Sequence, residues 1–165
     1  MVRKVDELGR VVIPKEMRRI LNIKTGSSIE MSINSDNQVV LKKFSELANI
    51  ISMAEALLSV IFDTFDIPCF LCDDERVLCV KGLSKKDYLD KRVCIQELDH
   101  NSGEITKLSN IICELRNDDN CTPFKVSSEG YEVGFLILVH NNKIDCGVKN
   151  SIELLLKLFS NLSNF

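Results

Sequence analysis

Short apolar runs at the start of the chain predict four β-strands. Val2–Val5 and Arg10–Ile13 are rich in β-branched residues, and the Asp-Glu-Leu-Gly sequence between them supplies a glycine for a turn with positive φ. Apolar and polar residues alternate strictly over Ile29–Ile33, which is typical of a half-buried strand. Val39–Leu41 is apolar again after Asn34–Asn37, a run of turn-forming residues. The four segments therefore predict two β-hairpins.

One short helix is predicted between these hairpins. Pro14 has no N–H to donate to a sheet, so it ends the second strand, and its fixed φ suits the first turn of a helix. Apolar residues at spacings of three and four then predict a helix over Lys15–Leu21. Four short strands and one helix bury little apolar area, and a domain of that size usually needs a partner to be stable. The sequence therefore predicts that residues 1–45 form a dimer.

The pattern after this point predicts a larger domain of mixed α+β class, which we assign to residues 46–165. Apolar residues recur at spacings of three and four over Glu46–Phe65 and predict a long amphipathic helix. Two strands of a hairpin follow at Cys69–Cys72 and Val77–Val80, and then a short helix at Lys85–Leu89. The other expected elements are a helix near Ile95–Leu98, strands near Ile111–Leu115, Phe124–Ser127 and Gly134–Val139, a turn at Ser128–Gly130 and a closing helix at Val148–Leu162.

Charge is divided unevenly between the two parts. Residues 1–43 carry nine basic and five acidic side chains, whereas residues 44–165 carry twelve basic and nineteen acidic ones. A basic N-terminal segment on an otherwise acidic chain favours a polyanionic partner for that segment. The planar set of donors on arginine suits phosphates and the edge of guanine, which favours DNA as the partner. The alternative to DNA binding is a solvated basic face with weak ion pairs to Glu7 and Glu16. The candidate DNA-binding residues are Arg3, Lys4, Arg10, Lys15, Arg18 and Arg19.

The run Val2–Arg19 reads V-R-K-V-D-E-L-G-R-V-V-I-P-K-E-M-R-R and resembles the signature of AbrB-type transition-state regulators. The likeness continues through Gly26, the Ile29–Ile33 strand and Val39–Phe44. The resemblance implies a swapped-hairpin β-barrel built by two chains, in which arginines of the first hairpin and of the short helix contact double-stranded DNA. By position it implies contacts from Arg3, Arg10, Arg18 and Arg19, with Lys4 and Lys15 on phosphates.

The order of elements in residues 46–165 resembles a GAF domain, a fold often used to sense small molecules. The resemblance implies a pocket bounded by residues from Gly82 to Pro123, but the sequence names no convergent polar set that would select a ligand. Sensing and a purely oligomerising role both stay open. The combination of the two domains implies a regulator of sporulation or stationary-phase genes, with tetramers formed through the helices that flank the GAF-like domain.

Seven cysteines raise the question of redox or metal chemistry. Cys69 and Cys72 form a C-x-x-C, which suggests a redox pair or half of a zinc site as an alternative regulatory function. The motif falls on a predicted strand, however, where residues three apart point to opposite faces. No second pair completes a zinc site, since the two histidines are His100 and His140. We expect reduced thiols that act as small buried hydrophobes, with no metal or cofactor.

Several classes of function find no support in the sequence. No serine or cysteine lies in a nucleophile context beside a histidine, and no glycine-rich phosphate loop occurs, so an enzyme is not expected. Charged residues interrupt the N-terminus, and the longest apolar run, Gly134–Val139, fits a buried strand; we therefore expect a cytoplasmic protein with no membrane partner. An antitoxin-type DNA-binding protein is the alternative, because related antitoxins share the swapped-hairpin N-terminal domain. Those antitoxins carry a disordered tail, however, whereas the pattern of residues 46–165 predicts a folded domain.

Overall fold

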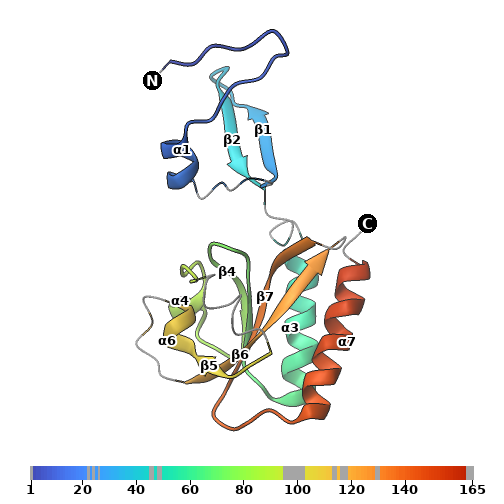
Figure 1. Ribbon diagram of the computed structural model, residues 1–165. Coiled ribbons are helices and arrows are strands. Elements are labelled where there is room, and N and C mark those ends of the chain that lie inside the picture. Colours follow the sequence, from blue (N-terminus) through green and yellow to red (C-terminus); the bar gives the residue numbers. More distant parts are fainter. Residues whose placement is uncertain are drawn as a thin grey trace. The chain divides into compact units, whose positions relative to one another are not determined.

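The computed structural model describes residues 2–21, 23, 25, 27–44, 47, 50–94, 103–112, 115, 119–128 and 131–162. The chain divides into two compact units, which we call unit 1 (Met1–Phe44) and unit 2 (Ser45–Phe165) (Figure 1). The helix predicted near Ile95–Leu98, and residues 129 and 130 of the predicted turn, lie outside the described residues.

Unit 1 contains one short helix and one β-hairpin. The helix α1 spans Lys15–Ile20 and follows Pro14, whose φ is −59°. Strands β1 (Ile29–Ile33) and β2 (Val39–Lys43) pair antiparallel, with Ile33 opposite Val39. Asn34 closes the hairpin, because its side-chain oxygen accepts hydrogen bonds from the backbone N–H groups of Asp36 and Gln38 at 3.1 and 2.9 Å. The predicted helix and the predicted second hairpin are confirmed.

The first predicted hairpin is present only as a turn. The N–H of Asp6 donates to the carbonyl of Arg10 at 3.0 Å, and Gly9 has the expected positive φ of 77°. The flanking segments 2–5 and 10–13 form no strand in the described structure, so the prediction of four strands in unit 1 is wrong for a single chain. A two-stranded hairpin is marginal unless one face is covered, and here Val2 and Val12 are 89% and 75% exposed.

Unit 1 buries few apolar side chains within one chain. Among its described residues only Pro14 and Ile23 are buried. A large apolar side chain contributes roughly 1.5–3 kcal/mol to stability when it is fully buried, so this unit gains little from its own interior. The exposed large apolar residues of unit 1 are Val2, Val5, Leu8, Val11, Val12, Met17, Ile20, Leu21, Met31, Ile33, Val39 and Phe44.

Unit 2 is built on a five-stranded sheet with the order β4-β3-β7-β6-β5, and every pairing in it is antiparallel (Figure 1). Its strands are β3 (Cys69–Cys72), β4 (Val77–Lys81), β5 (Thr106–Lys107), β6 (Asn120–Ser128) and β7 (Tyr131–His140). The predicted hairpin of Cys69–Cys72 with Val77–Val80 is confirmed as β3 and β4. The strands predicted at Phe124–Ser127 and Gly134–Val139 are confirmed and run longer than expected.

Helices cover both faces of this sheet. α3 (Ile51–Phe65) and α7 (Cys146–Leu162) lie side by side on one face, and α4 (Lys85–Tyr88) and α6 (Leu108–Ile111) pack on the other (Figure 1). The short helix predicted after β4 is confirmed to within one residue. The closing helix is confirmed and begins two residues earlier than predicted.

Two elements of unit 2 differ from the prediction. The long helix was expected from Glu46, but α3 begins at Ile51, because Ile50 has φ −114° and donates its N–H to Leu47, three residues back. The strand expected near Ile111–Leu115 is not formed at the described residues of that range. Residues up to Ile111 form helix α6, which buries Leu108 and Ile111 on one face, and Ile112 makes only an isolated bridge with Val93. A short apolar run of this kind fits a strand or a buried helix equally well.

The core of unit 2 follows the alternation along its central strand. Phe135, Ile137 and Val139 of β7 face the side covered by α4 and α6. Leu136 and Leu138 face the side covered by α3 and α7. Burial on both faces explains why this strand reads as a continuous apolar run rather than as an alternating one.

Gly134 in β7 provides a test of this packing. A Cβ at this position would collide with the carbonyl oxygen of Cys72 and with the side chain of Leu47, and would lie 3.2 Å from the Cα of Asp73. We predict that Gly134→Ala lowers the free energy of unfolding by about 1–3 kcal/mol, as overpacking does. Urea denaturation followed by circular dichroism measures this, with Ser127→Ala on the exposed side of β6 as the control. Equal stability of the two variants would contradict the packing.

Candidate nucleic-acid interface

The basic residues singled out from the sequence all lie in unit 1, on two neighbouring stretches of chain. Arg3, Lys4 and Arg10 flank or end the first turn, and Lys15, Arg18 and Arg19 lie on α1. All except Arg18 are exposed. The described residues show no ion pair from Glu7 or Glu16 to any of the six, so the neutralised basic face considered as an alternative is not formed by these glutamates.

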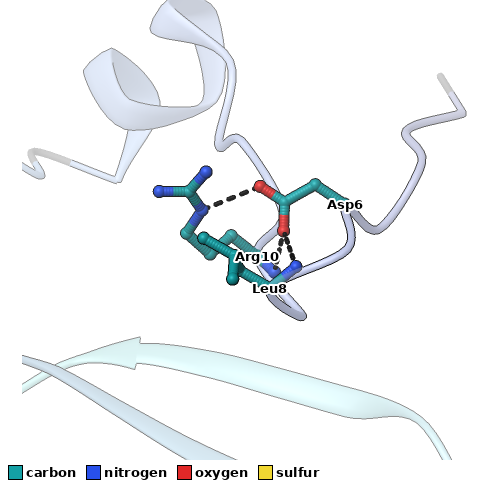
Figure 2. A network of polar contacts seen from close by, with 3 residues as sticks. All are labelled: Asp6, Leu8 and Arg10. Atoms are coloured by element: carbon teal, nitrogen blue, oxygen red, sulfur yellow. Dashed lines mark hydrogen bonds and ion pairs between the residues drawn. The ribbon is translucent and has the colours of Figure 1, made fainter.

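Arg10 is held by Asp6 across the turn (Figure 2). The Nε of Arg10 donates to Oδ2 of Asp6 at 2.7 Å, while Oδ1 of Asp6 accepts from the backbone N–H groups of Leu8 and Arg10 at 3.0 and 2.8 Å. The pKa of Asp6 is lowered, first by the Arg10 N–H and then by the Arg10 side chain. The side chain of Arg10 is nevertheless 72% exposed. The turn therefore presents a guanidinium that is both anchored and accessible.

The two arginines on α1 are in different environments. Arg19 is exposed, whereas Arg18 is half-buried and its Nε is buried with no hydrogen-bond partner among the described residues. Both lie in the last turn of the helix, where positive charge also stabilises the C-terminal end of the helix dipole. As expected from their adjacent positions, they do not share one ion pair in the described structure.

The C-x-x-C motif does not form a thiol pair. Cys69 and Cys72 are free and buried, and they belong to the two apolar clusters on opposite faces of the sheet, as predicted from their spacing on a strand. Burial raises the pKa of Cys69 to about 12, and it raises the pKa of Cys72 as well. A buried thiol of high pKa yields little thiolate, the reactive and metal-binding form. The arrangement gives no support to the redox or metal-sensing alternative.

One cysteine departs from the expectation of reduced thiols. Cys94 is disulfide-bonded. Cys79 and Cys121 are free and buried, and Cys146 is free and exposed. Across the described ranges no group of three or more histidine, cysteine or carboxylate side chains is arranged to hold a metal ion. Within the same residues no helix is long and apolar enough to cross a membrane.

In the region where a ligand pocket was expected, Tyr88, Leu108, Ile111 and Ile112 are buried in the apolar cluster against the sheet. A cleft of about 460 Å³ lies at the end of β7 and includes His140. Both ring nitrogens of His140 are used within the chain, by Thr122 Oγ1 at 2.9 Å and by the carbonyl of Asn142 at 2.7 Å. His140 is therefore fixed as a structural group.

Unit 1 is similar in sequence to a known family and to two known regulators. Residues 2–45 match the family described as "Antidote-toxin recognition MazE, bacterial antitoxin". Two proteins of Bacillus subtilis (strain 168), "Putative transition state regulator Abh" and "Transition state regulatory protein AbrB", are each 52% identical over 44 residues. These segments make up 27% of this chain and 47% and 45% of the two relatives. Residues 2–45 are therefore similar to MazE/AbrB-type N-terminal domains.

A third relative extends the likeness. "Stage V sporulation protein T" of Bacillus subtilis (strain 168) is 40% identical over 93 residues, which is 56% of this chain and 52% of that protein. The chain thus spans about half the length of the curated relatives it matches. The printed names of two of these relatives describe transition state regulators, and the matching family is described as an antitoxin.

The Asp6–Arg10 contact predicts a pH dependence of the turn. Because the native pKa of Asp6 lies below its ordinary value of 3.8, its hydrogen bonds are fully present above that value and are lost as the pH falls through the native pKa. Carboxyl ¹³C NMR of Asp6, with the amide protons of Leu8 and Arg10, should report one common titration. In Arg10→Ala the pKa of Asp6 should be lowered less than in the wild type but should stay below 3.8, because the backbone N–H donors remain. An Asp6 that titrates at or above 3.8 in the wild-type protein would contradict the geometry.

Proposed function

We propose that the protein is a DNA-binding transcription regulator whose unit 1 contacts duplex DNA. The observation that carries this proposal is a set of exposed basic side chains, including Arg3, Arg10 and Arg19, in a segment 52% identical to transition state regulators. The relative named for sporulation supports a role in sporulation or stationary-phase gene control. Phosphates bind such side chains regardless of sequence, and base edges and groove shape provide the selectivity.

Two copies of unit 1 form the DNA-binding body in this proposal. The support is the number of apolar side chains that one copy leaves exposed, among them Val5, Val11 and Val12 beside the first turn. Pairing of the flanks of that turn with a second chain, as in a swapped-hairpin barrel, would cover these side chains and complete the strands that a single chain lacks. A second chain could also supply a hydrogen-bond partner for the buried Nε of Arg18.

Unit 2 serves in this proposal as a GAF-like tether that joins DNA-binding bodies. α7 carries an exposed apolar stripe at a spacing of four residues, Leu154, Leu158 and Leu162, on a helix that buries Ile152, Leu156 and Phe159 in its own core. An exposed apolar stripe of this kind can pack against a helix of a second copy of the chain. Joining two DNA-binding bodies raises the local concentration at a second site, so binding is strengthened without a new contact. Sensing of a small molecule by this domain is a further possibility of the GAF-like fold.

Antitoxin activity is the second candidate, because the family that matches residues 2–45 is described by that activity. An antitoxin of the type considered uses a disordered tail, whereas unit 2 has a sheet with apolar clusters on both faces. The regulator is therefore the better supported function.

Arg19→Ala tests the DNA contact. We predict that it weakens binding to an A·T-rich duplex and lowers the salt dependence of binding by about one ion, while the fold is unchanged. Fluorescence anisotropy over a salt series measures both quantities. Arg92→Ala, which removes an exposed arginine of unit 2, is the matched control and should leave both unchanged. Absence of salt-sensitive binding by the wild-type chain would overturn the regulator and favour a toxin partner.

Leu158→Lys tests the role of the stripe on α7. We predict that this change lowers the mass of the assembly in sedimentation experiments, because it places a charge within an apolar contact between helices. Glu153→Lys puts the same side chain on an exposed position of the same helix that faces away from the stripe, and it should leave the mass unchanged. If the two variants have the same mass as the wild type, the stripe does not join copies of the chain.

A further inference from the structure

The carboxylate of Asp6 has all of its contacts within the first turn. Oδ1 accepts from two backbone N–H groups, and Oδ2 accepts from Arg10 Nε at 2.7 Å (Figure 2). Three hydrogen bonds fix the orientation of this side chain relative to the backbone. An aspartate that only formed the turn would need Oδ1 alone, so the bond from Oδ2 to Arg10 calls for a separate explanation.

The ion pair occupies one part of the guanidinium and leaves another open. Nε is bound to Asp6, whereas Nη1 and Nη2 have no partner among the described residues and the side chain is 72% exposed. The two outer nitrogens point their N–H groups in parallel, and this pair of donors fits two acceptors at once. Guanine offers O6 and N7 in this arrangement, and a phosphate offers two oxygens.

From this geometry we propose that Asp6 is a positioning residue for DNA binding, which orients Arg10 so that its outer nitrogens form a two-pronged contact with paired acceptors on duplex DNA. The proposal rests on the DNA-binding function proposed above. Asp6 does not touch DNA itself. It restricts the rotamers of a long side chain before binding, which reduces the conformational entropy lost when the contact forms.

The chain offers variants that separate turn formation from positioning. Asp6→Asn keeps an oxygen that can accept from the N–H groups of Leu8 and Arg10, but places an NH₂ group where Arg10 Nε needs an acceptor. Glu7→Gln is the matched control, since it removes the same charge from the same turn and Glu7 has no contact with Arg10 in the described structure. Arg10→Lys keeps the positive charge and loses the fork of donors.

The experiment compares DNA affinities of these full-length variants. The probe is a duplex enriched by the wild-type chain from a random pool, together with the same duplex containing 7-deazaguanine, which lacks the N7 acceptor. We expect Asp6→Asn to bind the selected duplex about tenfold more weakly than Glu7→Gln, in line with the loss of one two-pronged contact. In the Arg10→Lys background, Asp6→Asn should cause no further loss, because Asp6 acts through the arginine.

Two arms identify the acceptor on DNA. If Arg10 binds guanine, 7-deazaguanine weakens the wild-type protein and has little effect on Asp6→Asn. If Arg10 binds a phosphate, 7-deazaguanine has no effect, and the salt dependence of binding falls by about one ion in Asp6→Asn. Equal affinities and salt dependences of Asp6→Asn and Glu7→Gln would overturn the positioning role.

A measurement without DNA separates this proposal from the function on which it rests. In the ¹⁵N NMR spectrum, the Arg10 Nε–H signal should shift in Asp6→Asn, while the amide signals of Leu8 and Arg10 stay close to their wild-type positions. If the signal shifts but the wild-type chain binds no duplex, the ion pair is real and the DNA-binding function fails. If the wild-type chain binds DNA and the signal does not shift, the positioning role alone fails.

Discussion

The structure depends on whether each apolar surface is covered. Unit 2 covers both faces of its sheet with its own helices, so that residues such as Phe70, Leu71, Leu136 and Ile137 are completely buried. Unit 1 has no such cover and exposes most of its large apolar side chains. Because burial of apolar area is the main source of stability, unit 2 meets this requirement within one chain and unit 1 does not. This difference is the physical basis for proposing that two copies of unit 1 associate.

The polar chemistry of unit 1, in contrast, is formed locally. The bonds from Asp6 to Leu8 and Arg10 span at most four residues and need only the turn at Gly9. They are present in a single chain whose segments 2–5 and 10–13 form no strand. The orientation of Arg10 therefore does not require a second copy of the chain. A site that is ordered by local hydrogen bonds keeps its geometry even where the surrounding unit is stabilised from outside.

Local patterns were predicted well from the sequence, and elements that depend on distant contacts were not. The strand at Ile29–Ile33 and the hairpin of Cys69–Cys72 with Val77–Val80 have their own turns and are confirmed. The half-burial expected for the first of these strands is not seen in one chain, where Met31 and Ile33 are exposed. The first hairpin lacks a covering face, and the segment near Ile111 is helical because of the sheet on which it packs. The basic residues were found through charge and resemblance. The contacts of Asp6 with Arg10 were not predicted, although an aspartate and an arginine four residues apart across a glycine turn were a visible signal.

Small size explains why positioning and tethering belong together in the proposed mechanism. A unit of this size offers few contacts to a duplex, so each contact has to lose little entropy when it forms. Anchoring of Arg10 by Asp6 lowers this loss for a single side chain. Joining several copies of unit 1 through unit 2 lowers the entropy lost by the whole assembly, since the second copy binds from a raised local concentration. Anchoring and tethering thus both reduce the entropy lost on binding, one for a side chain and the other for a whole unit. Because unit 2 is acidic, in this proposal it joins copies of unit 1 without competing with them for phosphates.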